Sequence, residues 1–125
     1  MELNEKDKKG YYPLLLACKN NNIKIVKLFF DYANNNDIIL ELNGKWERGN
    51  YPFLWACYNN KIEIVKLLIE YASKNNIILK LNEINKSGNY ILLCVCDKSN
   101  IDIVELLIDY ANKKQYYFEI EWKRY

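Results

Sequence analysis

The cysteines are the first residues whose type and spacing could do chemistry. The chain has four, and Cys18, Cys57 and Cys96 stand 39 residues apart. Cys94 lies two positions before the last of them. Zinc would need ligands that converge, and no histidine is present to complete such a set. Evenly spaced single cysteines are more typical of small, buried apolar side chains in a reducing compartment. We therefore expect no metal, no cofactor and an intracellular, cytoplasmic location.

Carboxylates could also do acid–base chemistry. Five of them fall at helical spacing, on the polar side of apolar-faced segments; they are Glu63, Glu70, Asp102, Glu105 and Asp109. A solvated helix face explains that placement. The chain has only four glycines, and it contains no phosphate-binding loop, nucleophile elbow or HExxH motif. The sequence predicts no catalytic residues, no small-molecule substrate and a protein that is not an enzyme.

The net charge and the length of the apolar runs argue against a nucleic-acid-binding protein and a membrane protein. The formal net charge is +2, from 18 basic and 16 acidic residues, which does not favour sequence-independent binding of nucleic acid. A basic and aromatic surface for nucleic acid stays open as an alternative, because Lys8 and Lys9 cluster and Trp46 could stack beside Arg48. Interleaved acidic residues such as Glu47 argue against it. The longest apolar runs are far shorter than the roughly 20 residues that span a bilayer, so we expect no membrane association.

The segments that carry these residues repeat along the chain. The markers of the period are Gly10, Gly49 and Gly88, and Tyr12, Tyr51 and Tyr90. Residues 3–41, 42–80 and 81–119 align without a gap, and twelve positions are identical in all three. Residues 120–125 remain as a C-terminal tail. Chance does not keep a register over a whole chain, so we expect residues 1–125 to form one domain built from three modules.

Each module predicts two helices and an extended connection. In the first, a turn at Gly10 precedes Pro13, which suits the first turn of a helix because its missing N–H is not needed there. Asparagines at 20–22 end that helix, and residues 23–32 place apolar side chains on one face at helical spacing. Residues 38–42 then lead into the next module. So small a helix pair cannot bury its own apolar faces, which predicts an all-α solenoid of three helix-turn-helix repeats with extended connecting loops.

The segments Gly10–Cys18 and Ile25–Phe30, with their copies Gly49–Cys57 and Ile64–Ile69, resemble the ankyrin repeat. They are similar to the family's Gly-x-Thr-Pro-Leu-His-x-Ala-Ala and Ile-Val-x-x-Leu-Leu patterns. The resemblance implies an ankyrin-like scaffold that binds other proteins and has no chemistry of its own.

Three departures from the family pattern lead to structural expectations. Tyrosine replaces the usual threonine and leucine the usual histidine in each copy, so we expect apolar packing in place of the hydrogen bonds between neighbouring first helices. Ala33 and its copies stand at the usual glycine stop, which predicts a second helix that continues for a few residues. The period is 39 residues where the family has about 33, so the connection after the second helix is longer.

The resemblance also implies where a partner would bind, namely at the loop tips and the exposed edge of the first helices. These positions vary between the copies here. The candidate residues are Lys8, Lys9, Tyr11, Trp46, Glu47, Arg48, Asn50, Lys86 and Asn89 in the tips, and Lys19, Tyr58 and Asp97 at the helix ends. We expect Trp46, Arg48 and Tyr58 at the centre, because exposed Trp, Tyr and Arg are the residue types that anchor interfaces. The alternative for Trp46 is packing against a neighbouring loop.

The expected function is a non-catalytic scaffold that binds another protein. Two alternatives stay open: an assembly unit that self-associates through its repeat ends, and a fragment of a longer ankyrin array. The segment 116–122 bears on this choice, because its residues 118–122 alternate apolar and acidic side chains as a half-buried strand would. We expect it to cap the last helix pair, since so much exposed aromatic surface would invite association. An adhesive edge is the alternative.

Overall fold

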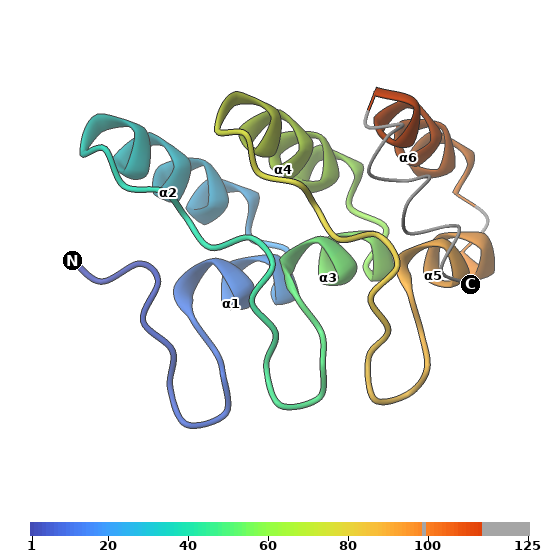
Figure 1. Cartoon of the computed structure of the whole chain (residues 1–125), viewed down its shortest axis with the longest axis horizontal. Coiled ribbons are helices and arrows are strands. Elements are labelled where there is room, and N and C mark those ends of the chain that lie inside the picture. Colours follow the sequence, from blue (N-terminus) through green and yellow to red (C-terminus); the bar gives the residue numbers. More distant parts are fainter. Residues whose placement is uncertain (99, 114–125) are drawn as a thin grey trace.

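Six helices form three pairs that stack in a row in the computed structural model, which describes residues 1–98 and 100–113 (Figure 1). The helices are α1 (Pro13–Lys19), α2 (Ile23–Asn35), α3 (Pro52–Tyr58), α4 (Ile62–Lys74), α5 (Ile91–Asp97) and α6 (Ile101–Lys113). The short first helices lie side by side in one layer and the longer second helices in another (Figure 1). No strand occurs in the described ranges. The predicted all-α solenoid is confirmed, whereas the predicted cap at residues 116–122 lies outside the described residues.

Local residue types explain where the short helices begin and end. Pro13 and Pro52 occupy the first turn of α1 and α3, each after a tyrosine with extended backbone. The residues that follow the two helices include Asn21 and Asn60, whose φ angles are 59° and 61°. Asparagine adopts this left-handed conformation at lower cost than most residues, because its short polar side chain can hydrogen-bond locally. The asparagines therefore end the first helices, as the sequence predicts.

The second helices continue past the alanine that replaces the family's glycine. α2 runs two residues beyond Ala33, and α4 runs two residues beyond Ala72. The left-handed residue then comes later and is not glycine: Asp37 has a φ of 53° and Asn76 a φ of 56°. The predicted extension of these helices is confirmed.

The apolar core runs without interruption from the first helix pair to the third. Small buried side chains, such as Ala17 and Ala56, let the short helices approach closely. Burial of the apolar faces depends on a neighbouring pair. Leu54 in the middle pair is 2% exposed, whereas Leu93 in the same position of the third pair is 47% exposed. A module of this kind is therefore stable only as part of a stack.

The cysteines follow the same dependence on a neighbour. Cys18 and Cys57 are buried as predicted, and burial raises the pKa of Cys18 to about 12, so its thiol stays neutral. Cys96 was expected to be buried in the same position of the third module, but it is exposed, and Cys94 is buried instead. Cys96 lies three residues after Leu93 on the same face of α5. The equivalent residues of α3, Leu54 and Cys57, are buried because a further helix pair follows them.

Asparagine side chains tie each connecting segment to the module before it. Asn4 donates a hydrogen bond to the carbonyl of Ile39 at 2.9 Å and accepts one from the N–H of Glu41 at 2.8 Å. Asn43 makes the equivalent two bonds in the next module: it donates to the carbonyl of Ile78 at 3.0 Å and accepts from the N–H of Lys80 at 3.2 Å. These amides supply the extended backbone with partners that a β-sheet would otherwise provide.

Tyrosine hydroxyls on the second helices make another set of ties. Tyr71 on α4 accepts a hydrogen bond from the N–H of Leu40 at 3.1 Å, and Tyr110 on α6 accepts one from the N–H of Leu79 at 2.9 Å. Each hydroxyl reaches back to the connection that leaves the preceding helix pair. The ring of Tyr71 also stacks on Phe30 of α2, with centroids 4.5 Å apart.

Tyr12 and Tyr51 add polar contacts that the sequence did not predict. Apolar packing was the expected substitute for the family's threonine and histidine at these positions, and both rings are buried. Their hydroxyls, however, donate hydrogen bonds to backbone carbonyls of the following connection. Tyr12 reaches Gly44 at 3.0 Å, and Tyr51 reaches Lys80 at 2.7 Å. The buried rings thus supply apolar packing as expected, and their hydroxyls add bonds to the connection that the sequence did not predict.

Replacing Tyr71 with phenylalanine would test these ties, because it removes the acceptor of the Leu40 N–H and keeps the stacked ring. We expect the free energy of unfolding to fall by about 1–3 kcal/mol, since a buried donor is left unpaired. Urea unfolding followed by circular dichroism measures the change. Tyr32→Phe is the matched control, because Tyr32 holds the same position on α2 and its hydroxyl forms no hydrogen bond to a connection within the described residues. Equal losses in the two variants would contradict the role of the hydroxyl.

Candidate protein-binding surface

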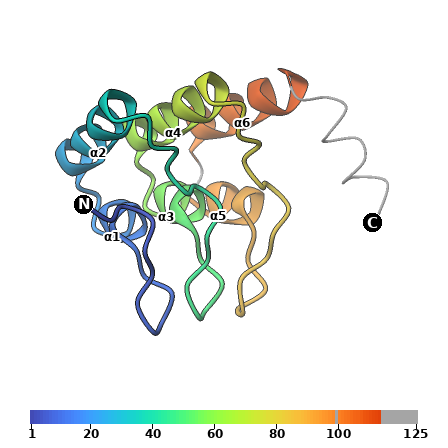
Figure 2. The ribbon, with the colours of Figure 1, turned by 60° about the vertical axis from the view of Figure 1, so that its left-hand side comes forward.

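Three loops project from the stack beyond the short helices (Figure 2). We call them the fingers, and they comprise residues 6–11, 45–50 and 84–89. A glycine with positive φ closes the turn of each finger, at 91° for Gly10 and 87° for Gly49. Such angles strain any residue with a Cβ, which explains the glycines of the period. All candidate residues of the loop tips lie on these three fingers.

Trp46 breaks the local pattern of the fingers. In the first finger Asp7 accepts two hydrogen bonds from backbone N–H groups, both at 2.9 Å, and in the third finger Asn85 accepts two at 3.0 Å. Trp46 stands at the equivalent position of the second finger, and an indole cannot accept such bonds. A residue that gives up a structural role of this kind marks a position where function can outweigh local stability.

Backbone hydrogen bonds join neighbouring fingers. The N–H of Glu47 donates to the carbonyl of Lys9 at 2.7 Å, and the N–H of Lys86 donates to the carbonyl of Arg48 at 3.0 Å. The side chain of Asn85 also donates to Asn50 at 2.8 Å. These contacts fix the three tips relative to one another, so their side chains form one surface.

Four aromatic side chains gather where the first two fingers meet α3. We call Tyr11, Trp46, Trp55 and Tyr58 the aromatic cluster. Tyr11 and Trp46 are stacked, with centroids 5.0 Å apart and planes 20° apart. Trp55 and Tyr58 meet edge to face at 5.9 Å. Tyr58 is 46% exposed and the other three are half-buried, so Trp46 packs on the neighbouring finger and still shows part of its ring.

Trp55 was not among the candidate residues, because it lies within the apolar run of its helix. The signal that could have identified it is the contrast between copies: Leu16 and Cys94 occupy the same position in the other two modules. A tryptophan there enlarges the aromatic surface of the middle module alone.

Lys19 lies over three rings of the aromatic cluster. Its Nζ is 4.9 Å from the centroid of Tyr11, 5.6 Å from that of Trp46 and 5.8 Å from that of Trp55. It also donates a hydrogen bond to the Tyr11 hydroxyl at 3.1 Å. A cation at these distances is attracted by the negative face of a ring, so the ammonium is held over the cluster.

Two further basic groups are held in the same way. The guanidinium of Arg48 lies 5.7 Å from the Trp46 centroid, and Nζ of Lys98 lies 5.2 Å from the Tyr58 centroid. Lys98 was not among the candidate residues. We call Lys19, Arg48 and Lys98 the cation row, since each of the three modules contributes one member.

The two indole N–H groups of the aromatic cluster lack acceptors. Nε1 of Trp46 and Nε1 of Trp55 are both buried, and neither has a hydrogen-bond partner among the described residues. A buried donor without an acceptor costs about 1–3 kcal/mol. Two hydrogen-bond donors of the cluster are therefore unpaired in the part of the chain that the structure describes.

The remaining candidates surround this centre. Exposed side chains at the tips and helix ends are Lys8, Lys9, Glu47, Arg48, Lys86 and Asp97. Asn50 and Asn89 are half-buried, and Asn50 accepts the side-chain bond that links the second and third fingers. The structure thus brings Tyr11, Lys19 and Trp46 into contact, while Asn50 holds the fingers together.

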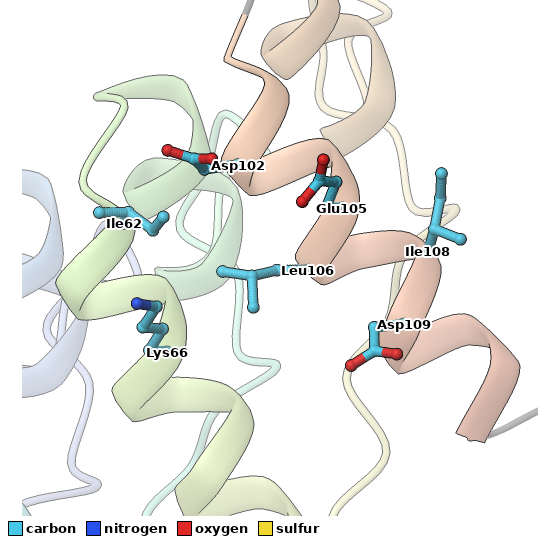
Figure 3. Close-up of a pocket in the computed structure, with 7 residues that line it drawn as sticks. All are labelled: Ile62, Lys66, Asp102, Glu105, Leu106, Ile108 and Asp109. Atoms are coloured by element: carbon cyan, nitrogen blue, oxygen red, sulfur yellow. The ribbon is translucent and has the colours of Figure 1, made fainter.

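A groove of about 600 Å³ lies away from the fingers, between α4 and α6 (Figure 3). Its lining residues are Ile62, Lys66, Asp102, Glu105, Leu106, Ile108 and Asp109. The three carboxylates are exposed, as a solvated helix face predicts. Across the described ranges, no three Cys, Asp or Glu side chains come together as metal ligands would. No helix there is both long and apolar enough to cross a bilayer.

Replacing Gly10 with alanine would test how closely the fingers are coupled. A Cβ at Gly10 would lie 2.8 Å from Cα of Trp46 and 2.9 Å from the carbonyl oxygen of Lys45. Gly88→Ala is the matched control, because its φ is also positive but nothing lies within 4 Å of the added atom. We expect Gly88→Ala to lose about 1–2 kcal/mol from backbone strain alone.

Gly10→Ala should lose clearly more than this control in thermal unfolding, because the second finger must also move. The near-ultraviolet circular dichroism of the indoles should change in Gly10→Ala only. If the two variants lose the same stability and keep the same spectrum, the fingers are not in close contact.

Models of known families match most of the chain. One, described as ankyrin repeats in three copies, matches residues 1–77, and another, described as ankyrin repeats in many copies, matches residues 53–108. No individual curated protein matches the chain. The first match covers more than half of the 125 residues, and the helix pairs follow the order that the repeat requires. The chain therefore belongs to the ankyrin repeat family, whose repeats generally serve as protein–protein interaction modules and typically lack enzymatic activity.

Proposed function

We propose that this protein is a non-catalytic scaffold that binds another protein through the fingers and the adjoining ends of the first helices. The observation that carries the proposal is the aromatic cluster, in which four aromatic side chains lie together at the surface and two indole N–H groups have no acceptor in residues 1–98 and 100–113. Trp, Tyr and Arg dominate the binding energy of protein interfaces, and they do so at well-packed central positions. Trp46, Arg48 and Tyr58 form that centre.

The rigidity of the fingers supports the same function. Backbone bonds from Glu47 to Lys9 and from Lys86 to Arg48 hold the tips in place before any partner arrives. A surface that is already ordered loses less conformational entropy on binding, so more of the contact energy appears as affinity. Tyr11, Asn50, Asn89 and Asp97 complete the surface with Lys8, Lys9, Lys19, Glu47 and Lys86.

We propose the same organisation for the chain as the sequence predicts. Residues 1–125 form a single ankyrin-repeat domain, with repeats at 3–41, 42–80 and 81–119 and a tail at 120–125. The continuous core through the three helix pairs supports one cooperative unit over the described residues.

Self-association through the repeat ends is the second candidate, and a specific observation favours it. Leu92 and Leu93 on α5 are 45% and 47% exposed, and Cys96 on the same helix is exposed as well. Sedimentation velocity over a wide concentration range decides this: an assembly unit gives a sedimentation coefficient that rises with concentration and falls again in Leu93→Lys. A monomer at all concentrations excludes the second candidate.

Replacing Trp46 and Tyr58 together with alanine tests the main proposal. Partners are captured on immobilised wild-type protein and identified, and the affinity of each is then measured by calorimetry. We expect the double variant to bind such a partner at least about tenfold more weakly, because central aromatic anchors carry most of the binding energy. The matched control is Leu28→Ala with Ile108→Ala, two apolar side chains on second helices that are 64% and 55% exposed.

The control variant should bind as the wild type does. If a partner binds the aromatic double variant as tightly as the wild type, the fingers and first-helix ends are not its binding surface. Circular dichroism of both variants excludes loss of folding as the cause.

A further inference from the structure

We propose that the surface recognises an extended acidic segment of the partner protein, whose carboxylates pair with the cation row. This inference rests on the proposed function and specifies the chemistry of the partner. It follows from the state of the three cations, from the charge around them and from their spacing along the stack.

The three cations are held in place and are free to pair. The aromatic rings position Lys19, Arg48 and Lys98, each at less than 6 Å from a ring centroid. In residues 1–98 and 100–113 no carboxylate forms an ion pair with any of them. An ammonium has three N–H donors, and Lys19 uses one of them on the Tyr11 hydroxyl. Donors remain for an incoming carboxylate.

The side chains around the cation row carry a net positive charge. Lys8, Lys9 and Lys86 are exposed on the fingers and extend the positive surface. Three exposed carboxylates, Asp7, Glu47 and Asp97, stand against these lysines and the three cations of the row, so the surface remains positive. Oδ1 of Asp7 already accepts two backbone hydrogen bonds. Complementary potential of this kind steers an acidic partner to the surface and fixes its register.

The charge on α6 has the opposite sign. Asp102, Glu105 and Asp109 are exposed along that helix, away from the fingers. The basic character is therefore a property of the fingers and first-helix ends rather than of the whole chain, whose net charge is only +2.

The spacing of the row suits an extended chain. Neighbouring helices in contact lie about 8–10 Å apart, and Lys19 and Lys98 stand at the ends of first helices two modules apart, so roughly twice that distance separates them, with Arg48 on the finger of the module between. An extended segment in the polyproline II conformation advances about 3.1 Å per residue with three residues per turn, so every third side chain points to the same side. Carboxylates at every third position would therefore meet successive members of the row. Apolar side chains between them would lie against the exposed parts of Trp46 and Tyr58.

Acceptors from the same segment would satisfy the indoles. Among the described residues the buried N–H groups of Trp46 and Trp55 have no partners. If neighbouring side chains move slightly on binding, oxygen atoms of the bound segment reach these donors while Lys19 stays over the rings. Binding then removes the cost of the unpaired donors.

The experiment uses the whole chain and short synthetic peptides with Glu at every third position and Leu between. The test variant is Lys19→Gln with Arg48→Gln and Lys98→Gln. The control variant removes the same charge from second helices, by Lys24→Gln with Lys27→Gln and Lys66→Gln. Binding is followed by calorimetry and tryptophan fluorescence at low and high salt. We expect wild type and control to bind the peptide alike. The test variant should bind it at least about tenfold more weakly.

Binding should also weaken with added salt and disappear when Gln replaces Glu in the peptide. A charge exchange provides a second readout that does not depend on loss of binding. Arg48→Glu should weaken binding of the acidic peptide and strengthen binding of a peptide whose central Glu is replaced by Lys. Equal binding by test and control variants would overturn the proposal, and so would equal binding of the Gln peptide. A single-stranded oligonucleotide that binds through the row, where the acidic peptide does not, would overturn it in favour of nucleic acid.

Failure of this inference can be told from failure of the proposed function. A partner protein that loses affinity when Trp46 and Tyr58 are replaced, but binds the test variant normally, leaves the function standing and overturns the acidic segment. Conversely, row-dependent binding of the acidic peptide that is unaffected by the aromatic double variant supports pairing with the three cations. That result would contradict both the aromatic centre and the role of the Trp46 and Tyr58 rings in positioning the row.

Discussion

The backbone of the extended connections must find hydrogen-bond partners without forming a sheet, and the rest of the structure depends on how it does so. Amides of Asn4 and Asn43 and hydroxyls of Tyr71 and Tyr110 supply those partners. The two asparagines bind backbone of their own module, whereas each tyrosine belongs to the module after the backbone that it binds. The tyrosine bonds therefore demand the same neighbour that apolar burial demands, and the two requirements fix one register between modules.

That register also creates the binding surface. The ring of Tyr11 comes from the first finger, Trp46 from the second, and Trp55 from α3, yet one ammonium lies over all three. No single module contains this arrangement. It exists because the connections are held at fixed spacing and because Gly10 lets the backbone of the second finger approach closely. Stability and recognition thus have a common origin in the contacts between modules.

Much of the fold follows from local residue types, and the parts that do not are those that depend on neighbours. Prolines, asparagines and the alanine at position 33 define where helices begin and end, so the sequence predicts them well. The hydroxyl ties were missed because tyrosine counts as apolar in a periodic pattern, which says nothing of its oxygen. The prediction that Cys96 is buried was wrong because it assumed that every module has a neighbour on both sides. The third module exposes that face in the described structure. Trp46 and Arg48 were identifiable as exposed anchors, but the position of Lys19 over the rings needed the register.

Holding the cations on aromatic rings changes what an ion pair at this surface can contribute. An exposed lysine that forms an ion pair must give up rotamer freedom, which is one reason why surface pairs contribute only about 0–1 kcal/mol. Lys19 has already given up much of that freedom on folding, through its ring contacts and its bond to Tyr11. The half-buried rings also remove part of the water around the ammonium, which strengthens its attraction to an approaching carboxylate. A surface with few charges can therefore be selective when the charges it has are held in place.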